Sequence, residues 1–359
     1  MADTSAATGL QVQKWDDQYF REYLQQNPFK PYMGTGTNSI IQIKEDAVKR
    51  YQSITFALVN RLTGAAVTGS NTLEGNEEAM DSRSFVVQVD KRRNAVRTAD
   101  IEEQYSAIDL RRAKKDVLMD WSMEDLRDRI ISELGSINGV AYGSASEAQK
   151  DAWLVDNADR VLFGAAKANN SSNDHSLSLA NVDATNDKLT TSALSLMKRL
   201  ALTANPKVRP LRVGKENRRY YVAFVHPFVM RDLKTDSTLT SAQREVVIKN
   251  QNNRLFQGGD VDWDGIIVHE VDDMPIYSGV GNGSGDVSPV YLCGAQALGY
   301  GIAKRWYSFA ETFDYGDKHG LSINCIDSIK KMTFGSGSSD TADLKDHGVV
   351  TGYFSAAAD

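Results

Sequence analysis

The segment Tyr220–Val225 constrains the fold most, because every one of its residues is apolar or aromatic. A strand that is apolar at consecutive positions has to be buried on both faces, so we expect it in the centre of a sheet. A strand-like segment, 208–213, precedes it across a turn at 214–217, and this pattern predicts a hairpin. Pro227 suits the first turn of a helix that continues through Asp232.

Helical periodicity is strongest between residues 106 and 134. Ser106 and Ser122 each begin a Ser-x-x-acid pattern, which is typical of a helix start. The pattern therefore predicts either one interrupted helix or two consecutive ones, with Gly135 at the end. Two apolar stripes are expected to face the core: Leu110, Ala113, Val117 and Trp121, then Met123, Leu126, Ile130 and Leu134. Basic residues, among them Lys114 and Arg127, are expected on the opposite, solvated face.

Other regions are predicted more coarsely. A helical patch is expected near 153–163 and a helix over 190–203, whereas short strands and glycine turns are expected beyond Ser288. Helices and strands thus occur together, which predicts an α+β fold.

The first hundred residues contain few that could build a core. Strand-like segments at 51–62 and 85–89 are separated by a polar stretch, 63–84. A connection this long without core residues is uncommon inside a compact domain, so we expect residues 51–98 to form a two-stranded projection with a mobile tip. Ahead of it, aromatic side chains recur at the spacing of an amphipathic helix, which indicates an arm that lies on a partner. These residues are Trp15, Tyr19 and Tyr23.

Charge and hydropathy exclude several classes. The 359 residues carry 41 basic and 47 acidic side chains, a net charge of -6, which argues against binding nucleic acid over the whole surface. The longest apolar run, 220–230, is too short to span a bilayer, so we expect no membrane association. The two cysteines form no CxxC pair, and the first ten residues do not resemble a signal peptide.

Motifs for metal binding and catalysis are incomplete. The run from Asp260 to Gly265 resembles the first half of a calcium-binding EF-hand loop, but Val271 stands where the bidentate glutamate is required. Asp260, Asp262 and Asp264 are therefore weak metal candidates, and an acidic turn before a strand is the preferred interpretation. No nucleophile elbow or Cys/His signature is present, so we expect no enzyme activity, no catalytic residue and no cofactor.

Charged residues are unevenly distributed. Eight basic residues and one acid lie between Lys198 and Arg219, whereas six acids and no basic residue lie between Asp260 and Asp273. Two solvated faces would give this pattern, and so would complementary surfaces on neighbouring subunits. A nucleic-acid patch is a third, weaker interpretation. The candidate inter-subunit contacts are Trp15, Tyr19, Tyr23, Arg209, Arg212, Arg218, Arg219, Asp260, Asp262 and Asp264.

The order of these parts, together with three blocks of sequence, resembles the major capsid proteins of tailed bacteriophages, specifically the podovirus N-four-type family. The blocks are 220–227, 255–259 with 263–265, and 292–297. The resemblance implies the Hong Kong 97-like coat-protein fold. It also implies a division into an N-terminal arm (1–45), an extended loop built as a long β-hairpin (46–104), a peripheral domain with a spine helix (105–189), an axial domain (190–300), and a return to the peripheral domain with C-terminal strands (301–359).

The same resemblance implies a structural function. Copies of the chain would form the hexamers and pentamers of an icosahedral shell that encloses double-stranded DNA without reading its sequence. A separate scaffolding protein, a portal and a decoration protein are the partners to expect, with assembly in the bacterial host cytoplasm and a final place in the virion capsid. The alternatives are an encapsulin-like nanocompartment shell, which shares the fold, and a calcium-binding hydrolase.

Overall fold

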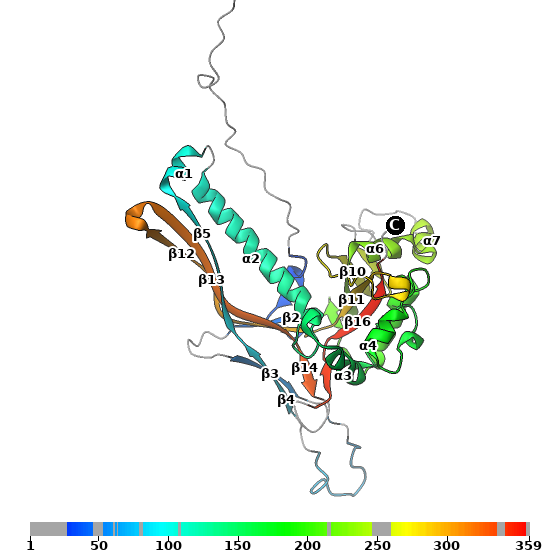
Figure 1. Ribbon diagram of the computed structural model, residues 1–359. Coiled ribbons are helices and arrows are strands. Elements are labelled where there is room, and N and C mark those ends of the chain that lie inside the picture. Colours follow the sequence, from blue (N-terminus) through cyan, green and yellow to red (C-terminus); the bar gives the residue numbers. More distant parts are fainter. Residues whose placement is uncertain are drawn as a thin grey trace, which may run out of the picture. The chain divides into compact units, whose positions relative to one another are not determined.

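The computed structural model (Figure 1) describes residues 27–45, 53–59, 62, 64–78, 82–106, 109–213, 217–245, 260–335 and 342–356. It contains helices and strands in comparable measure, which confirms the α+β class. The described residues divide into two compact units. The first comprises 91–126 and 304–326, and the second comprises 27–90, 127–303 and 327–359.

A seven-stranded sheet forms the centre of the second unit. Its strands lie in the order β6 (Val161–Phe163), β16 (Val349–Ser355), β11 (Val287–Cys293), β8 (Arg218–Val225), β10 (Ile266–Glu270) and β9 (Val261–Trp263), and β7 (Leu211–Val213) also pairs with β8. Strand β8 lies between β11 and β10, so its predicted central position is confirmed, as is its hairpin with β7. Residues 161–163, predicted as helical, are a fully buried strand instead.

Helices cover both faces of this sheet. Helices α5 (Thr191–Thr203) and α6 (Pro227–Thr235) supply Met197 and Val229 to one buried cluster, which also contains Leu162 of β6. Helices α3 (Glu147–Asn157) and α4 (His175–Ala180) supply Trp153 and Leu179 to another, which contains Val161 and Phe163. Successive strand residues point to opposite faces, so the two clusters lie on opposite sides of the sheet. Both α5 and α6 confirm the helices predicted there.

Shorter elements complete the second unit. They are helix α7 (Ser237–Glu245), the strand pair β14 (Thr333–Gly335) and β15 (Leu344–Asp346), and the 3₁₀ turns η2 (Lys30–Tyr32), η3 (Tyr142–Ser144), η4 (Lys167–Asn169) and η6 (Asn282–Ser284). No helix among the described residues is long and apolar enough to cross a membrane.

Residues 27–45 pack against their own chain. Phe29 is buried, and its ring lies 4.7 Å from that of Phe224 in β8. Strand β1 (Met33–Gly34) pairs with β2 (Ile41–Glu45), which runs parallel to the first residues of β12 (Leu298–Phe313). Residues 27–45 of the predicted arm thus have contacts within their own chain, and contact of the arm (1–45) with a partner stays a prediction. Trp15, Tyr19 and Tyr23 lie outside the described residues.

The two strands predicted in the first hundred residues are confirmed as β3 (Ser53–Val59) and β4 (Ser82–Gln88), which pair in antiparallel register. One face of this hairpin is anchored, because Ile54, Phe56 and Val87 are buried against Met332 and Phe334. Most of the other side chains of the hairpin are exposed.

The first unit combines a helix with long strands. It contains β5 (Asp90–Ala99) from Lys91 onward, α1 (Asp100–Tyr105), residues 110–126 of α2 (Leu110–Leu134), and the parts of β12 and β13 (Lys318–Lys331) that meet at the turn η7 (Asp314–Gly316). Strand β13 lies between β12 and β5. The prediction of short strands beyond Ser288 is wrong here, since β12 has 16 residues and β13 has 14.

Helix α2 runs without interruption, so the predicted start at Ser122 is wrong. The Ser122 hydroxyl donates to the carbonyl of Met119 (2.7 Å), a back-bond that a serine inside a helix can make. The helix instead begins after Asp109, whose carboxylate accepts from the backbone N–H of Arg112 (3.1 Å). Ser106 follows the last residue of α1 and does not cap α2.

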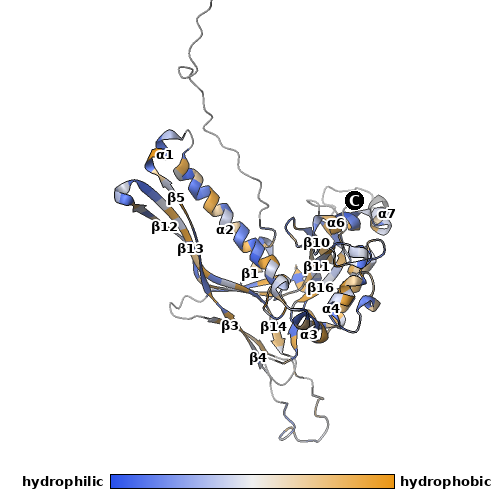
Figure 2. Ribbon diagram, in the orientation of Figure 1, coloured by the Kyte–Doolittle hydropathy of each residue, from blue (hydrophilic) through white to orange (hydrophobic). Residues whose placement is uncertain are grey.

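The buried face of α2 also differs from the predicted one. Val117 is 55% exposed, whereas its neighbour Leu118 and the charged Lys114 are buried. Figure 2 shows the resulting mixture of hydrophilic and hydrophobic bands along the helix. Lys114 is tolerated inside because its ammonium lies 2.9 Å from the Glu103 carboxylate and 3.3 Å from the His319 carbonyl. A buried charge that is paired and hydrogen-bonded escapes most of the desolvation cost.

Candidate assembly surfaces

The predicted basic contacts lie on one hairpin and the segment before it. Arg212 of β7 is directly opposite Arg219 of β8, and Arg218 is opposite Val213. Arg209 precedes β7, and all four arginine side chains are exposed. Like charges held opposite each other on a hairpin repel, so this arrangement favours an anionic group from outside the hairpin.

The predicted acidic contacts lie at the other hairpin of the same sheet. Asp260 and Asp262 flank Val261 in and before β9, and Asp264 forms the turn to β10 with a φ of +49°. Asp260 accepts from His269 Nδ1 (2.7 Å), while Asp264 pairs with Lys198 of α5 (2.7 Å). The carboxylates of Asp260 and Asp264 therefore contact two different side chains. This is the arrangement expected of an acidic turn before a strand. Burial, with a smaller contribution from Asp260, raises the pKa of nearby Tyr32 to about 12.

The basic and acidic stretches are neighbours in one chain. Strand β8 pairs with β10 in parallel, and Ile266 lies beside Tyr221. The Lys198–Asp264 pair joins the two stretches directly. Some of the charge complementarity seen in the sequence is therefore satisfied within the subunit, and contacts of the four arginines with a neighbouring subunit stay a prediction.

One cluster of possible metal ligands occurs among the described residues. Asp100, Glu103 and His319 of the first unit bring one ligand atom each within 4.8 Å of one another. The Glu103 carboxylate, however, already accepts from the Lys114 ammonium at 2.9 Å and from the Thr98 hydroxyl at 2.9 Å. A cation at this place would face an ammonium across the same carboxylate, so the cluster fits an ion-pair network better than a metal site.

The hairpin β3–β4 exposes apolar side chains away from its anchored face. Val59 and Val86 are more than half exposed, and so are Leu62 and Leu73 in the connection between the strands. Exposed apolar residues that recur along one projecting element are typical of a surface that contacts another protein.

The hairpin β12–β13 ends in an aromatic tip. Tyr315 is fully exposed, and Phe309 and Phe313 are largely exposed. Three consecutive residues, Asp314, Tyr315 and Gly316, have φ values of +55°, +53° and +103°. An ion pair between Lys318 and Asp314 (2.7 Å) closes the turn. Sequence reasoning missed this tip, although the Asp-Tyr-Gly-Asp run at 314–317 is a turn signal that directly follows Phe313.

A groove of about 220 Å³ lies elsewhere in the same unit, between α2 and the hairpin. Met119 and Ser122 form its helical side, and Trp306 of β12 packs edge-on against Trp121 at 6.0 Å. The remaining lining residues are Lys115, Tyr307, Ser308, Leu321 and Ile323. Its surface is mainly apolar, and Lys115 is the charged residue among those that line it.

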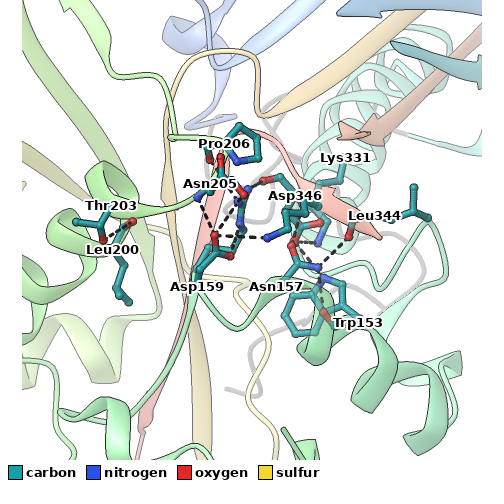
Figure 3. A network of polar contacts seen from close by, with 12 residues as sticks. Trp153, Asn157, Asp159, Leu200, Thr203, Asn205, Pro206, Lys331, Leu344 and Asp346 are labelled. Atoms are coloured by element: carbon teal, nitrogen blue, oxygen red, sulfur yellow. Dashed lines mark hydrogen bonds and ion pairs between the residues drawn. The ribbon is translucent and has the colours of Figure 1, made fainter. Parts of the chain in front are cut away.

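A buried polar network holds the second unit together (Figure 3). Lys331 pairs with Asp346 at 2.8 Å, with only 2% and 1% of the two side chains exposed. The Asp346 carboxylate also accepts from the Trp153 indole (3.2 Å), and the Asp346 backbone N–H donates to the Asn157 side chain (2.9 Å). The fully buried Arg160 donates to the Asp346 carbonyl and to the carbonyl of Asn205 (3.0 Å). Through Asp346, the network connects α3, β13 and β15 to one another.

Comparison with known proteins identifies relatives over the full length. A family model described as phage capsid protein matches residues 3–358. The major capsid protein of Pseudomonas phage KPP25 is 30% identical, and the match covers 97% of this chain and 96% of that protein. The cyanophage Pam1 capsid is 33% identical with a TM-score of 0.87 and full coverage of both chains. The capsid of Ralstonia phage GP4, 21% identical over 100% of this chain and 99% of the other, has the same fold with a TM-score of 0.76.

Proposed function

The chain belongs to the phage capsid protein family, has the Hong Kong 97-like fold and is a major capsid protein of a tailed phage, and from this premise we propose how it builds a shell. Copies of the chain form hexamers and pentamers of a closed icosahedral head around double-stranded DNA. The observation that carries this proposal is the projecting hairpin β3–β4, which is anchored on one face by Ile54 and Phe56 and exposes Val59 and Val86. Copies of one chain that share such surfaces close into symmetric assemblies.

The parts of the chain are assigned to this role as follows. Residues 1–45 are the N-terminal arm and 46–104 the extended loop. Helix α2, 25 residues long, is the spine helix of the peripheral domain of 105–189. The axial domain of 190–300 contains β8, β10 and β11. Residues from 301 onward return along β12 and β13 before the C-terminal strand β16 joins the central sheet beside β11.

The protein's role is structural and not catalytic. Membership of the phage capsid protein family supports this assignment, and buried ionisable groups such as Lys331 and Asp346 are used in an ion pair. The net charge of -6 agrees with a shell that encloses DNA without binding it tightly. We assign assembly to the host cytoplasm, guided by a separate scaffolding protein, with a portal and a decoration protein as further partners of the virion.

Removal of the exposed connection tests the shell proposal. We expect a variant in which residues 64–78 are replaced by a short Gly-Ser turn to fold, because the anchored face of β3–β4 is left intact. It should elute as free subunits or small oligomers and form no closed shells. The matched control keeps the length and the apolar residues of 64–78, replaces the exposed Thr68 and Asn71 with serine, and should form closed shells. Closed particles of normal size from the deletion variant, seen by electron microscopy, would contradict the proposal.

A further inference from the structure

We propose that the tip of the β12–β13 hairpin, residues 314–317, docks into the groove between α2 and the same hairpin of a second copy of this chain. The inference rests on the proposed shell function and adds the contact itself. Tyr315 is the inserted side chain, and Met119, Trp306 and Leu321 form the floor that receives it.

The tip is shaped to present an aromatic ring. Tyr315 is fully exposed in the subunit, and a positive φ is unusual for a bulky residue. Such backbone strain persists where the surroundings hold it and is concentrated at functional positions. The Lys318–Asp314 ion pair provides that restraint, so the turn is ordered before a partner arrives. Tyrosine presented in this way is a frequent anchor of protein interfaces.

The groove fits such a ring in size and character. Its volume of about 220 Å³ exceeds the cavity of about 150 Å³ that holds benzene in an apolar protein interior. Met119 is half exposed on the groove side of α2, and a flexible thioether adapts well to an aromatic neighbour.

Charge favours the same pairing. The tip carries Asp314 and Asp317, with Glu311 close in sequence, and these three carboxylates outnumber the cations Lys318 and Arg97 that act on Asp314. Among the described residues that line the groove, Lys115 is the one charged side chain. Lys304 contributes a second ammonium, 3.6 Å from the centre of the ring of Tyr307, which lines the groove. An acidic tip therefore meets a basic groove, which orients the contact.

A single chain cannot make this contact. The groove uses residues 306–308 of β12, and the tip begins at Asp314 on the same strand. At about 3.3 Å per residue, the tip lies roughly 20 Å beyond the groove along a continuous hairpin. The tip and the groove of one copy therefore cannot reach each other. The contact forms only between two copies, such as those related by a rotation axis.

Cysteine pairing in assembled particles tests the contact. The full-length chain with Tyr315→Cys and Met119→Cys should form disulfide-linked dimers and higher oligomers in particles and not in dissociated subunits. The matched control combines Met119→Cys with Val155→Cys, an exposed position on α3 of the second unit, and should remain monomeric on a non-reducing gel. The native Cys293 and Cys325 are buried and do not contribute.

The outcomes separate the contact from the shell function. Intact particles in which the Tyr315→Cys pair links no better than the control overturn the docking and leave the shell proposal standing. A wild-type chain that builds no particles even when the proposed scaffolding protein is supplied overturns the shell proposal itself.

Two further variants test the contact if the protein with the two cysteines fails to fold. Tyr315→p-benzoylphenylalanine should photo-crosslink in particles to the groove-lining tryptic peptides 116–127, 306–318 or 319–330 of another copy, and a crosslink only to peptides that do not line the groove overturns the docking. Tyr315→Ala should raise the concentration needed for half-assembly about tenfold, as expected for loss of about 1.4 kcal/mol at an interface anchor, and an unchanged value likewise overturns it.

Discussion

The ion pair between Lys331 and Asp346 gives the sharpest stability prediction. With 2% and 1% of the side chains exposed, both charges lie in the interior of the second unit and neither can be rehydrated when the other is removed. We expect Lys331→Met to destabilise the subunit by about 3–5 kcal/mol, the cost of a buried charge left without its partner. Asp346→Leu should cost at least as much, because the Trp153 indole N–H loses its acceptor as well.

The double variant separates pairing from packing. If the two single losses reflect unpaired charges, Lys331→Met combined with Asp346→Leu should be less destabilised than the sum of the two by about 1–3 kcal/mol. The matched control is Lys234→Met, which breaks a half-exposed pair with Glu270 (3.3 Å; 39% and 37% exposed). Screening by water limits that pair to about 1 kcal/mol or less.

Guanidinium unfolding of unassembled subunits, followed by tryptophan fluorescence, measures all four variants. The expected order of midpoints is wild type, then Lys234→Met close to it, then the two single network variants, with the double variant lowest but by less than the two single losses combined. A Lys331→Met midpoint equal to that of Lys234→Met, or a double variant equal to the sum of the singles, would refute the reasoning from buried charge.

Two further predictions concern other buried groups of the second unit. Burial lowers the pKa of His175 and of His347 to about 4. Between pH 6.5 and 4, these histidines are therefore protonated in the unfolded chain and neutral in the folded chain. Subunit stability should be constant above about pH 6.5 and fall as the pH drops toward 4, and His175→Phe should flatten part of this slope in unfolding titrations; an unchanged slope would contradict it. Gly164 has a φ of +59°, and a Cβ there would meet the Asp187 carboxylate at 2.2 Å, so Gly164→Ala should lower the unfolding midpoint well below that of Gly139→Ala, whose Cβ at a φ of +84° meets open space. Equal midpoints would show that the clash relaxes.

Local pattern was sufficient for much of the sheet and its helices. The uniformly apolar Tyr220–Val225 predicted the central strand, because no other environment accommodates such a run. The helix at 191–203 is begun by Thr190, whose hydroxyl accepts from the N–H of Ala193, a signal contained within four residues. Each of these features depends on neighbours in sequence.

Features that depend on distant residues were missed or misplaced. Lys114 and Arg127 were assigned to a solvated face, yet both are buried, and Arg127 pairs at 2.8 Å with Asp273 far along the chain. The Asp346 carboxylate likewise accepts from Trp153, which is far away in the sequence. No local sequence pattern distinguishes such a buried aspartate from one at the surface. The acidic turn at 260–264 was assigned as a turn before a strand because that signal is local, whereas its partners Lys198 and His269 were not foreseen.

The predicted apolar stripe on α2 fails in an informative way. Val117 was placed on the core face, yet in the subunit it is more exposed than buried, as are Val59 and Val86 of the projecting hairpin. For a chain that works alone, these side chains would be a liability, because exposed apolar surface promotes association. For a chain that works inside a shell, selection acts on the assembled state, so apolar periodicity marks what is buried in the particle and not only what is buried within one copy. Positions where pattern predicts burial and the single chain exposes the side chain are therefore where neighbouring copies should be sought, and Val117 lies on the same helix as the groove residue Met119.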